Sequence, residues 1–320
     1  MRSLLIFTLV CGAIVSGATL ASAGGPEPGS LLLYPIFDSS PGVATVFTVT
    51  NTNADPQTGA VYVHFYYIDG TTCQESNRVE RLTPNDTFTC IASAHNPQQS
   101  FGYLYLVATD GSRPITFNYL VGQLVTVDGI EGVEYGMNAW SFQGMTAYRT
   151  GTDLDADGIR DLDGLEYEQA PDQHFVTRFF GQGGPFESEL VLVNLTGGTQ
   201  FRSTIDFLVY NDNEQVFSAE TSFTCWTRRF LLDVSGIFSQ VFLDWSIDDL
   251  EELYGMPSIE TGWIRLDGSI ATSPTKSIDD PAFLAALIER VGSYGAADLP
   301  FGGGTQANGD LLPRSVNGDR

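Results

Sequence analysis

The strongest constraint on the fold is an alternation of side chains with a period of two. Residues 43–50 read VATVFTVT and residues 61–67 read VYVHFYY, so apolar or aromatic side chains recur at every second position. Successive side chains of a strand point to opposite faces of a sheet, and this pattern is typical of strands with one buried face. Comparable segments lie at residues 31–37, 78–82, 87–92 and 102–108, separated by turns rich in Asn, Asp, Gly and Pro. The sequence therefore predicts an all-β protein.

The second half of the chain echoes several of these segments in the same order. The segment 44–53 is matched by 189–194, 61–69 by 204–212, Thr87-Phe-Thr-Cys90 by Ser222-Phe-Thr-Cys225, and 101–105 by 261–265. Order and comparable spacing indicate an internal repeat. We therefore expect two tandem immunoglobulin-like or jelly-roll-like β-sandwich domains. Their expected limits are 24–150 and 173–301, with an acidic linker at 151–172 and a flexible tail at 302–320.

Two short helical insertions are expected in the second domain. Ser246 is a candidate N-cap for an amphipathic segment that ends at Gly255. Asp280 followed by Pro281 is typical of a helix start, and apolar residues at 283, 284, 287 and 288 predict a second helix that ends at Gly292.

The N-terminal segment has the pattern of a secretory signal peptide. Arg2 is followed by the apolar run 4–15, and the small residues Ala21-Ser22-Ala23 form a cleavage pattern, which predicts removal of residues 1–23. No later segment is apolar for long enough to span a bilayer. We expect a secreted protein, extracellular or at the cell surface, with the periplasm as an alternative.

The charge of the chain limits its partners. Its formal net charge is -24, with 15 basic and 39 acidic residues, and loss of Arg2 with the signal makes it -25. A chain this acidic repels nucleic acid and favours cation binding. Only Lys276 among the basic residues is Lys, a bias that favours a bacterial source.

Three cysteines remain after the expected cleavage removes Cys11. Disulfides persist in exported proteins, and Cys73 and Cys90 lie on neighbouring expected strands, so we expect these two to form a disulfide. Cys225 is then left as a small buried residue.

The densest cluster of carboxylates lies in the expected linker. Residues 153–164 read DLDADGIRDLDG. This segment resembles the D-x-D-x-D-G-x-x-D calcium loops of thrombospondin type 3 repeats and is similar to the first nine positions of an EF-hand or dockerin loop. The resemblance implies one Ca²⁺ site. Its ligands would be the side chains of Asp153, Asp155, Asp157 and Asp161 and the carbonyl of Ile159.

The chemistry of the segment favours the same ion. Carboxylates at alternate positions of a tight turn can converge on one hard cation, and Gly158 allows the sharp bend. Gly164 stands where an EF-hand has its closing Glu, so Asp163, Glu166 and Glu168 remain alternatives for the last ligand. Such a site would stiffen the joint between the two domains.

Motifs for catalysis are missing from the sequence. It contains no G-x-S-x-G and no H-E-x-x-H, and its three histidines, His64, His95 and His174, are far apart. We therefore expect a secreted calcium-binding structural or adhesion-type extracellular protein without catalytic activity, with unidentified protein or glycan partners.

Two other functions remain as alternatives. Aromatic residues on expected strands, above all Tyr103 and Trp263, favour a carbohydrate-binding module that stacks rings on sugars. An extracellular hydrolase would need a site built from distant acids such as Asp206, Asp233 and Asp244.

Overall fold

The computed structural model describes residues 27–197, 200–244 and 260–311. The expected signal peptide, the expected helix at 246–255 and residues 312–320 of the expected tail lie outside these residues. Within the described ranges no helix is long and apolar enough to cross a membrane.

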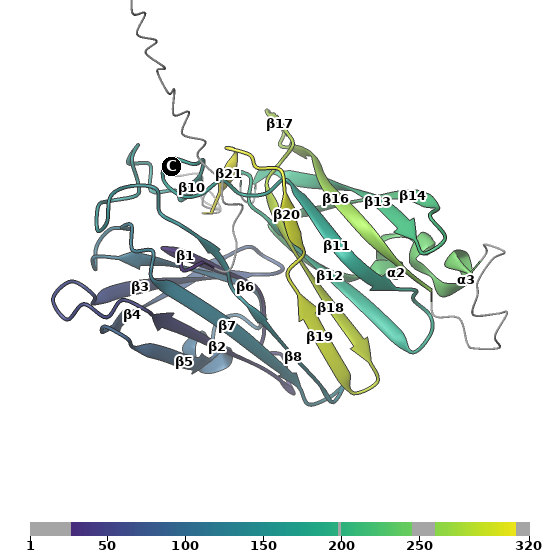
Figure 1. The fold of residues 1–320 in the computed structure, drawn as a ribbon, viewed down its shortest axis with the longest axis horizontal. Helices are drawn as coiled ribbons and strands as arrows, with labels where there is room; N and C mark the ends of the chain where they lie inside the picture. The colour runs from purple at the N-terminus through teal and green to yellow at the C-terminus, as the bar shows by residue number, and fades with distance from the viewer. Residues whose placement is uncertain (1–26, 198–199, 245–259, 312–320) are drawn as a thin grey trace, which may run out of the picture.

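The first half forms two antiparallel sheets (Figure 1). The strand order of one sheet is β4-β3-β6-β1-β9, and that of the other is β5-β2-β7-β8. The strands are β1 (Leu31–Asp38), β2 (Val43–Asn51), β3 (Val61–Asp69), β4 (Glu75–Leu82), β5 (Thr87–Ile91), β6 (Phe101–Thr109), β7 (Leu120–Asp128), β8 (Val133–Asn138) and β9 (Trp140–Phe142). A short helix, α1 (Ala92–His95), follows β5.

The second half forms two further antiparallel sheets, with strand orders β14-β13-β16-β11-β20 and β15-β12-β18-β19. The strands are β11 (Gln173–Phe180), β12 (Phe186–Asn194), β13 (Arg202–Asn211), β14 (Val216–Thr224), β15 (Trp226–Phe230), β16 (Thr261–Thr272), β18 (Phe283–Val291), β19 (Tyr294–Asp298) and β20 (Phe301–Gly303). The smaller elements are β17 (Ser277–Asp279), which pairs with β16, and the helices α2 (Leu231–Val234), η2 (Gly236–Phe238) and α3 (Gln240–Leu243). A separate two-stranded sheet joins β10 (Asp161–Leu162) to β21 (Gly309–Asp310).

The prediction of an all-β chain is confirmed, but the expected pair of tandem β-sandwich domains is wrong. Strands account for 57% of the structure and helices for 6%, and the antiparallel sheets are arranged like the blades of a four-bladed β-propeller. The physical reason lies in the sheet of β12 and β18, which is not the outer wall of a separate domain. It is buried on both faces and packs against both halves of the chain.

Alternate residues of β12 and β18 belong to different cores. Val191, Val193, Leu284, Ala286 and Ile288 pack in a cluster with the first half, from Leu31 to Phe142. Their neighbours along the same strands pack inside the second half; these are Leu190, Leu192, Phe283, Ala285 and Leu287. Because side chains of a strand alternate between faces, both faces of this sheet are apolar, and the core on one of its faces is built from residues of both halves.

The expected helix at 280–292 is therefore a strand. In β18 the run FLAALI is fully buried, and β18 pairs with β12 over nine positions, from Asn194 opposite Phe283 to Phe186 opposite Val291. A strand buried on both faces is apolar at every position, and such a run has no period that separates it from a buried helix.

The two halves share one strand order. Strands β1 to β9 occupy the same places in their sheets as β11 to β16 and β18 to β20 in theirs, in that sequence. A register shift interrupts both first strands, between Tyr34 and Phe37 in β1 and between Val176 and Phe179 in β11. The matched TFTC and SFTC segments do not obey this order, since the first lies in β5 and the second ends β14.

A disulfide ties the two halves together, and it is not the expected one. Cys73 bonds to Cys225, with 6.3 Å between their Cα atoms, and Cys90 is a free thiol. The sequence suggested Cys90 as the partner because it is close along the chain, whereas Cys225 reaches Cys73 only through the packing of the halves. Burial, and to a smaller extent the charge of Glu80, raise the pKa of the Cys90 thiol to about 12.

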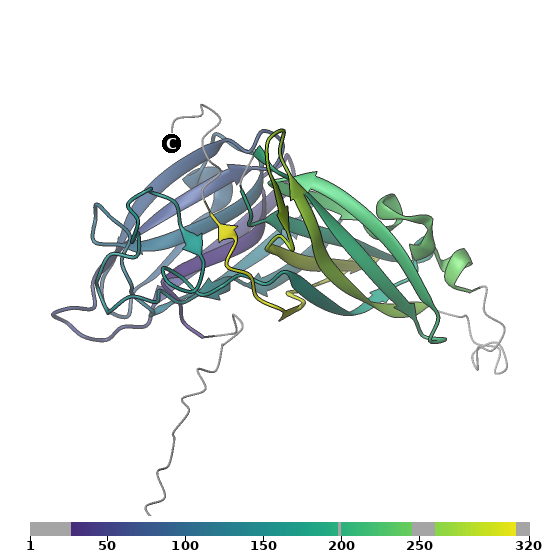
Figure 2. The ribbon, with the colours of Figure 1, turned by 90° about the horizontal axis from the view of Figure 1, so that it is seen from above.

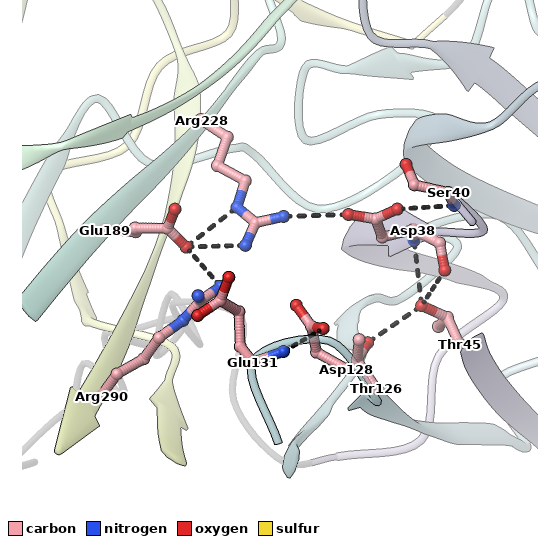
Figure 3. Close-up of polar contacts among 9 residues, drawn as sticks. All are labelled: Asp38, Ser40, Thr45, Thr126, Asp128, Glu131, Glu189, Arg228 and Arg290. Atoms are coloured by element: carbon pink, nitrogen blue, oxygen red, sulfur yellow. Dashed lines mark hydrogen bonds and ion pairs between the residues drawn. The ribbon is translucent and has the colours of Figure 1, made fainter. Parts of the chain in front are cut away.

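An ion-pair network lies close to the same junction (Figure 3). The Arg228 guanidinium donates to Asp38 Oδ2 at 3.1 Å and to Glu189 Oε2 at 2.7 Å, and Arg290 donates to the same oxygen of Glu189 at 3.1 Å. The side chains are 8–20% exposed. Asp38 comes from the first half and the other three residues from the second, so the network holds the two halves in register.

Candidate functional site

The acidic segment lies where the two halves meet. Figures 1 and 2 show β10 and β21 together beside the junction of the two halves. The buried side chains of Ile159, Leu162 and Tyr167 anchor the segment, and Thr152 Oγ1 donates to Tyr167 Oη at 2.9 Å. The segment is thus a packed loop with fixed ends.

Two groups of carboxylates converge in this loop. Asp153, Asp155 and Glu166 form one group, and Asp155, Asp157 and Asp161 form the other. Within each group one oxygen atom of every residue lies within 4.8 Å of those of the others. Oxygens that bind the same Ca²⁺ at about 2.3–2.6 Å lie up to about 5 Å apart, so either group fits around one ion.

The backbone of the loop holds these acids close together. The amide of Asp157 donates to Asp155 Oδ1 at 3.1 Å, and the amide of Ile159 donates to Asp157 Oδ1 at 2.7 Å. Gly158 adopts φ +79° between them, a conformation that costs glycine little. The turn therefore depends on the glycine that the sequence pattern places there.

Glu166 is the most unusual acid of the site. Only 3% of the residue is exposed, and its carboxylate accepts hydrogen bonds from the amides of Leu154 and Asp161. Burial, and to a smaller extent the charges of Asp161 and Asp153, raise its pKa to about 7 against the lowering effect of those amide bonds. A cation between these acids would relieve this repulsion.

Asp153 also has a buried carboxylate oxygen in this site. Its Oδ1 atom is buried and has no hydrogen-bond partner within the described residues. A buried carboxylate oxygen without a donor or a cation is costly. It lies in the same group as Glu166 and Asp155.

The structure brings most of the sequence-predicted ligands together. Asp153, Asp155, Asp157 and Asp161 are all in the two groups. Asp163 is in neither group, and its carboxylate accepts from the amides of residues 165 and 166 at 2.7 and 3.0 Å. The groups comprise side chains alone; the expected backbone ligand, the Ile159 carbonyl, accepts from Arg160 at 3.3 Å. Of the three alternatives for the last ligand, only Glu166 joins a group, since the Glu168 carboxylate accepts from the amide of Gln143 at 2.9 Å.

Arg160 connects this loop to the first half. Its guanidinium is buried, donates to the Gly158 carbonyl at 2.7 Å and to Tyr66 Oη at 3.2 Å, and lies 5.8 Å from the centroid of the Tyr66 ring. The position of Arg160 faces Tyr66 of β3.

The loop is connected to the second half through the C-terminal strand β21. β10 pairs with β21, placing Asp161 opposite Asp310. Asp310 in turn donates from its amide to the Leu195 carbonyl and accepts from the amide of Gly197 at 2.9 Å. The acidic loop therefore touches both halves of the molecule.

The other candidate residues do not converge. His64 and His95 bond the hydroxyls of Tyr66 and Tyr67, and His174 bonds the carbonyl of Phe283, so each histidine has a separate structural role. The acids proposed for a hydrolase lie exposed on different elements and form no acidic group within the described residues; they are Asp206, Asp233 and Asp244.

The two aromatic residues suggested for sugar stacking differ in their exposure. Tyr103 is 2% exposed and packs in the core, so its ring is not open to a ligand. Trp263 is 37% exposed and stacks on Tyr210 with 4.1 Å between the ring centroids.

Comparison with protein-family models and with curated proteins finds no match. The chemistry of the acidic loop is therefore the main guide to function.

Proposed function

We propose that this chain is a secreted structural or adhesion-type protein without catalytic activity, in which a Ca²⁺ ion bound by the 153–166 loop stabilises the junction of the two halves. The observation that carries the proposal is the convergence of five acids, Asp153, Asp155, Asp157, Asp161 and Glu166, in a loop that contacts both halves. Clusters of oxygen ligands without nitrogen or sulfur suit Ca²⁺ better than zinc or copper.

The disulfide supports the exported location. Cys73–Cys225 joins segments far apart in the sequence, and such bonds persist in oxidising compartments. Calcium is plentiful outside cells, so a site with a dissociation constant on the order of 10⁻⁴ to 10⁻³ M would be occupied there.

Calorimetric titration of the protein with Ca²⁺ tests the proposal. We expect one site, and a gain of about 2.7 kcal/mol in unfolding free energy when the free Ca²⁺ concentration is about 100 times the dissociation constant. Because Asp155 belongs to both acidic groups, Asp155→Asn should abolish the binding.

Asp163→Asn is the matched control, since Asp163 lies in the same loop but in neither group, and an Asn side chain can still accept from the same amides. Its dissociation constant for Ca²⁺ should stay within about a factor of three of that of the unmodified protein, which is a difference in binding free energy below about 1 kcal/mol. A protein that binds no Ca²⁺, or that binds it without a change in its unfolding temperature, would contradict the proposed role.

A further inference from the structure

A cavity of about 270 Å³ lies between β11 and the hairpin of β18 and β19, far along the chain from the acidic loop. Val176, Leu287 and Pro300 contribute apolar surface to it. Arg178, Glu289 and Asp298 contribute two carboxylates and one guanidinium, so the formal charge of its lining is -1. The cavity is large enough for a small organic molecule.

Glu289 is buried at this cavity with an unused acceptor. The residue is 8% exposed, and its Oε2 atom accepts from the Arg178 guanidinium. Its Oε1 atom is buried and finds no hydrogen-bond partner in the described part of the chain. Ser188, opposite Glu289 on β12, has a buried hydroxyl in the same condition. The wall of the cavity thus contains a buried carboxylate whose negative charge only Arg178 offsets, and a cation in the cavity would stabilise it.

Arg178 is already engaged by its neighbours. It lies in the irregular stretch of β11 between Val176 and Phe179, which turns its side chain toward Glu289. Its guanidinium also lies 4.9 Å from the centroid of the Phe180 ring. The charge left for a ligand is therefore negative.

The first half provides an internal comparison, because its strands have the same order and pairing. Asn51 ends β2 and Asn194 ends β12, and each side chain accepts from the amide two residues later at 3.0 Å. Counting pairs from these residues places Thr45 and Thr126 at the positions of Ser188 and Glu289. There the two threonine hydroxyls satisfy each other at 2.9 Å.

The equivalent strand registers of the two halves also account for the cavity. The positions of Val176, Ala296 and Asp298 correspond in the first half to three large buried side chains, Tyr34, Tyr135 and Met137. Smaller or charged residues thus replace a filled core, and a buried carboxylate replaces a satisfied hydroxyl pair. The second half has lost packing here and gained a polar cavity.

We propose that this cavity binds a small organic cation, a primary ammonium with an apolar body. The ammonium lies against the Glu289 and Asp298 carboxylates and balances their charge, and the apolar body packs against Val176, Leu287 and Pro300. A neutral alcohol would leave the net charge unbalanced, and a carboxylate would add to it.

Saturation-transfer NMR with benzylammonium tests the proposal, with benzyl alcohol and benzoate as the neutral and anionic counterparts of the same shape. Benzylammonium should bind, benzyl alcohol should bind about tenfold more weakly or worse, and benzoate should give no signal. Equal binding of the ammonium and the alcohol, or no binding of the ammonium, would overturn it.

Variants locate the site. Glu289→Gln should weaken benzylammonium binding about tenfold or more. Ala296→Tyr should abolish it by placing in the cavity the side chain that the first half accommodates at this position. Glu220→Gln, an exposed acid on β14, is the matched control and should leave binding unchanged. If Glu289→Gln does not fold, Ala296→Tyr alone decides, and unaltered binding by that variant refutes the assignment.

Discussion

Removing the Cys73–Cys225 disulfide should destabilise the whole molecule strongly. The two cysteines are separated by 152 residues, and closing a loop of that length removes about 17 cal/mol/K of chain entropy from the unfolded state. At 25 °C this corresponds to about 5 kcal/mol, and measured values for disulfides usually fall somewhat below such figures. We therefore expect the double variant Cys73→Ala/Cys225→Ala to lose about 3–5 kcal/mol of unfolding free energy.

Equilibrium unfolding in urea measures this loss. The slope of free energy against urea should also increase, because the unfolded chain becomes more expanded without the cross-link. The matched control is Cys90→Ala, which removes a cysteine that forms no disulfide and should cost less than half as much. A loss below about 1 kcal/mol for the double variant, or a peptide map that joins Cys73 to Cys90, would refute the reasoning.

Three further outcomes follow from buried groups. Burial lowers the pKa of His174 to about 4. The buried neutral ring contributes stability that is complete above about pH 6.5 and falls by about 3 kcal/mol as the pH drops toward 4, so the unfolding free energy should fall less between pH 7 and pH 4.5 for His174→Gln than for the unmodified protein. Arg228→Met leaves Asp38 without its ion pair and should cost about 3 kcal/mol in thermal or urea unfolding, against less than about 0.5 for the exposed Glu131→Gln. Leu284→Ala should cost about 2–5 kcal/mol, and fluorescence and circular dichroism should still report one common transition, since its core spans both halves; separate transitions would contradict the shared core.

The strands with one buried face were predictable, and the doubly buried sheet was not. Along β2 and β3 the period of two is visible because one face differs from the other. In β18 both faces are buried, so FLAALI shows no alternation, and Asp280-Pro281 in front of it suggested a helix start. The pairing of β12 with β18 between two cores depends on the tertiary arrangement, which local pattern does not contain.

The candidate metal site was predictable because it depends on local sequence and not on the tertiary arrangement. Its ligands lie within a few residues of one another, so spacing alone brought Asp153, Asp155, Asp157 and Asp161 together. Glu166 was one of three alternatives, and only its burial distinguishes it. The partner of Cys73 and the cavity at Glu289 involve segments far apart in the chain, where the sequence offers no spacing to count.

The doubly buried sheet also sets the order in which the protein can fold. Residues 27–150 emerge first during synthesis, but their core is completed by Leu284, Ala286, Ile288 and Leu311. The first half therefore waits, with exposed apolar surface, until nearly the whole chain has been made. Contacts of such long sequence separation slow folding and favour aggregation of the waiting chain. A fragment that ends before β18 should consequently depend on chaperones, however regular its own strands are.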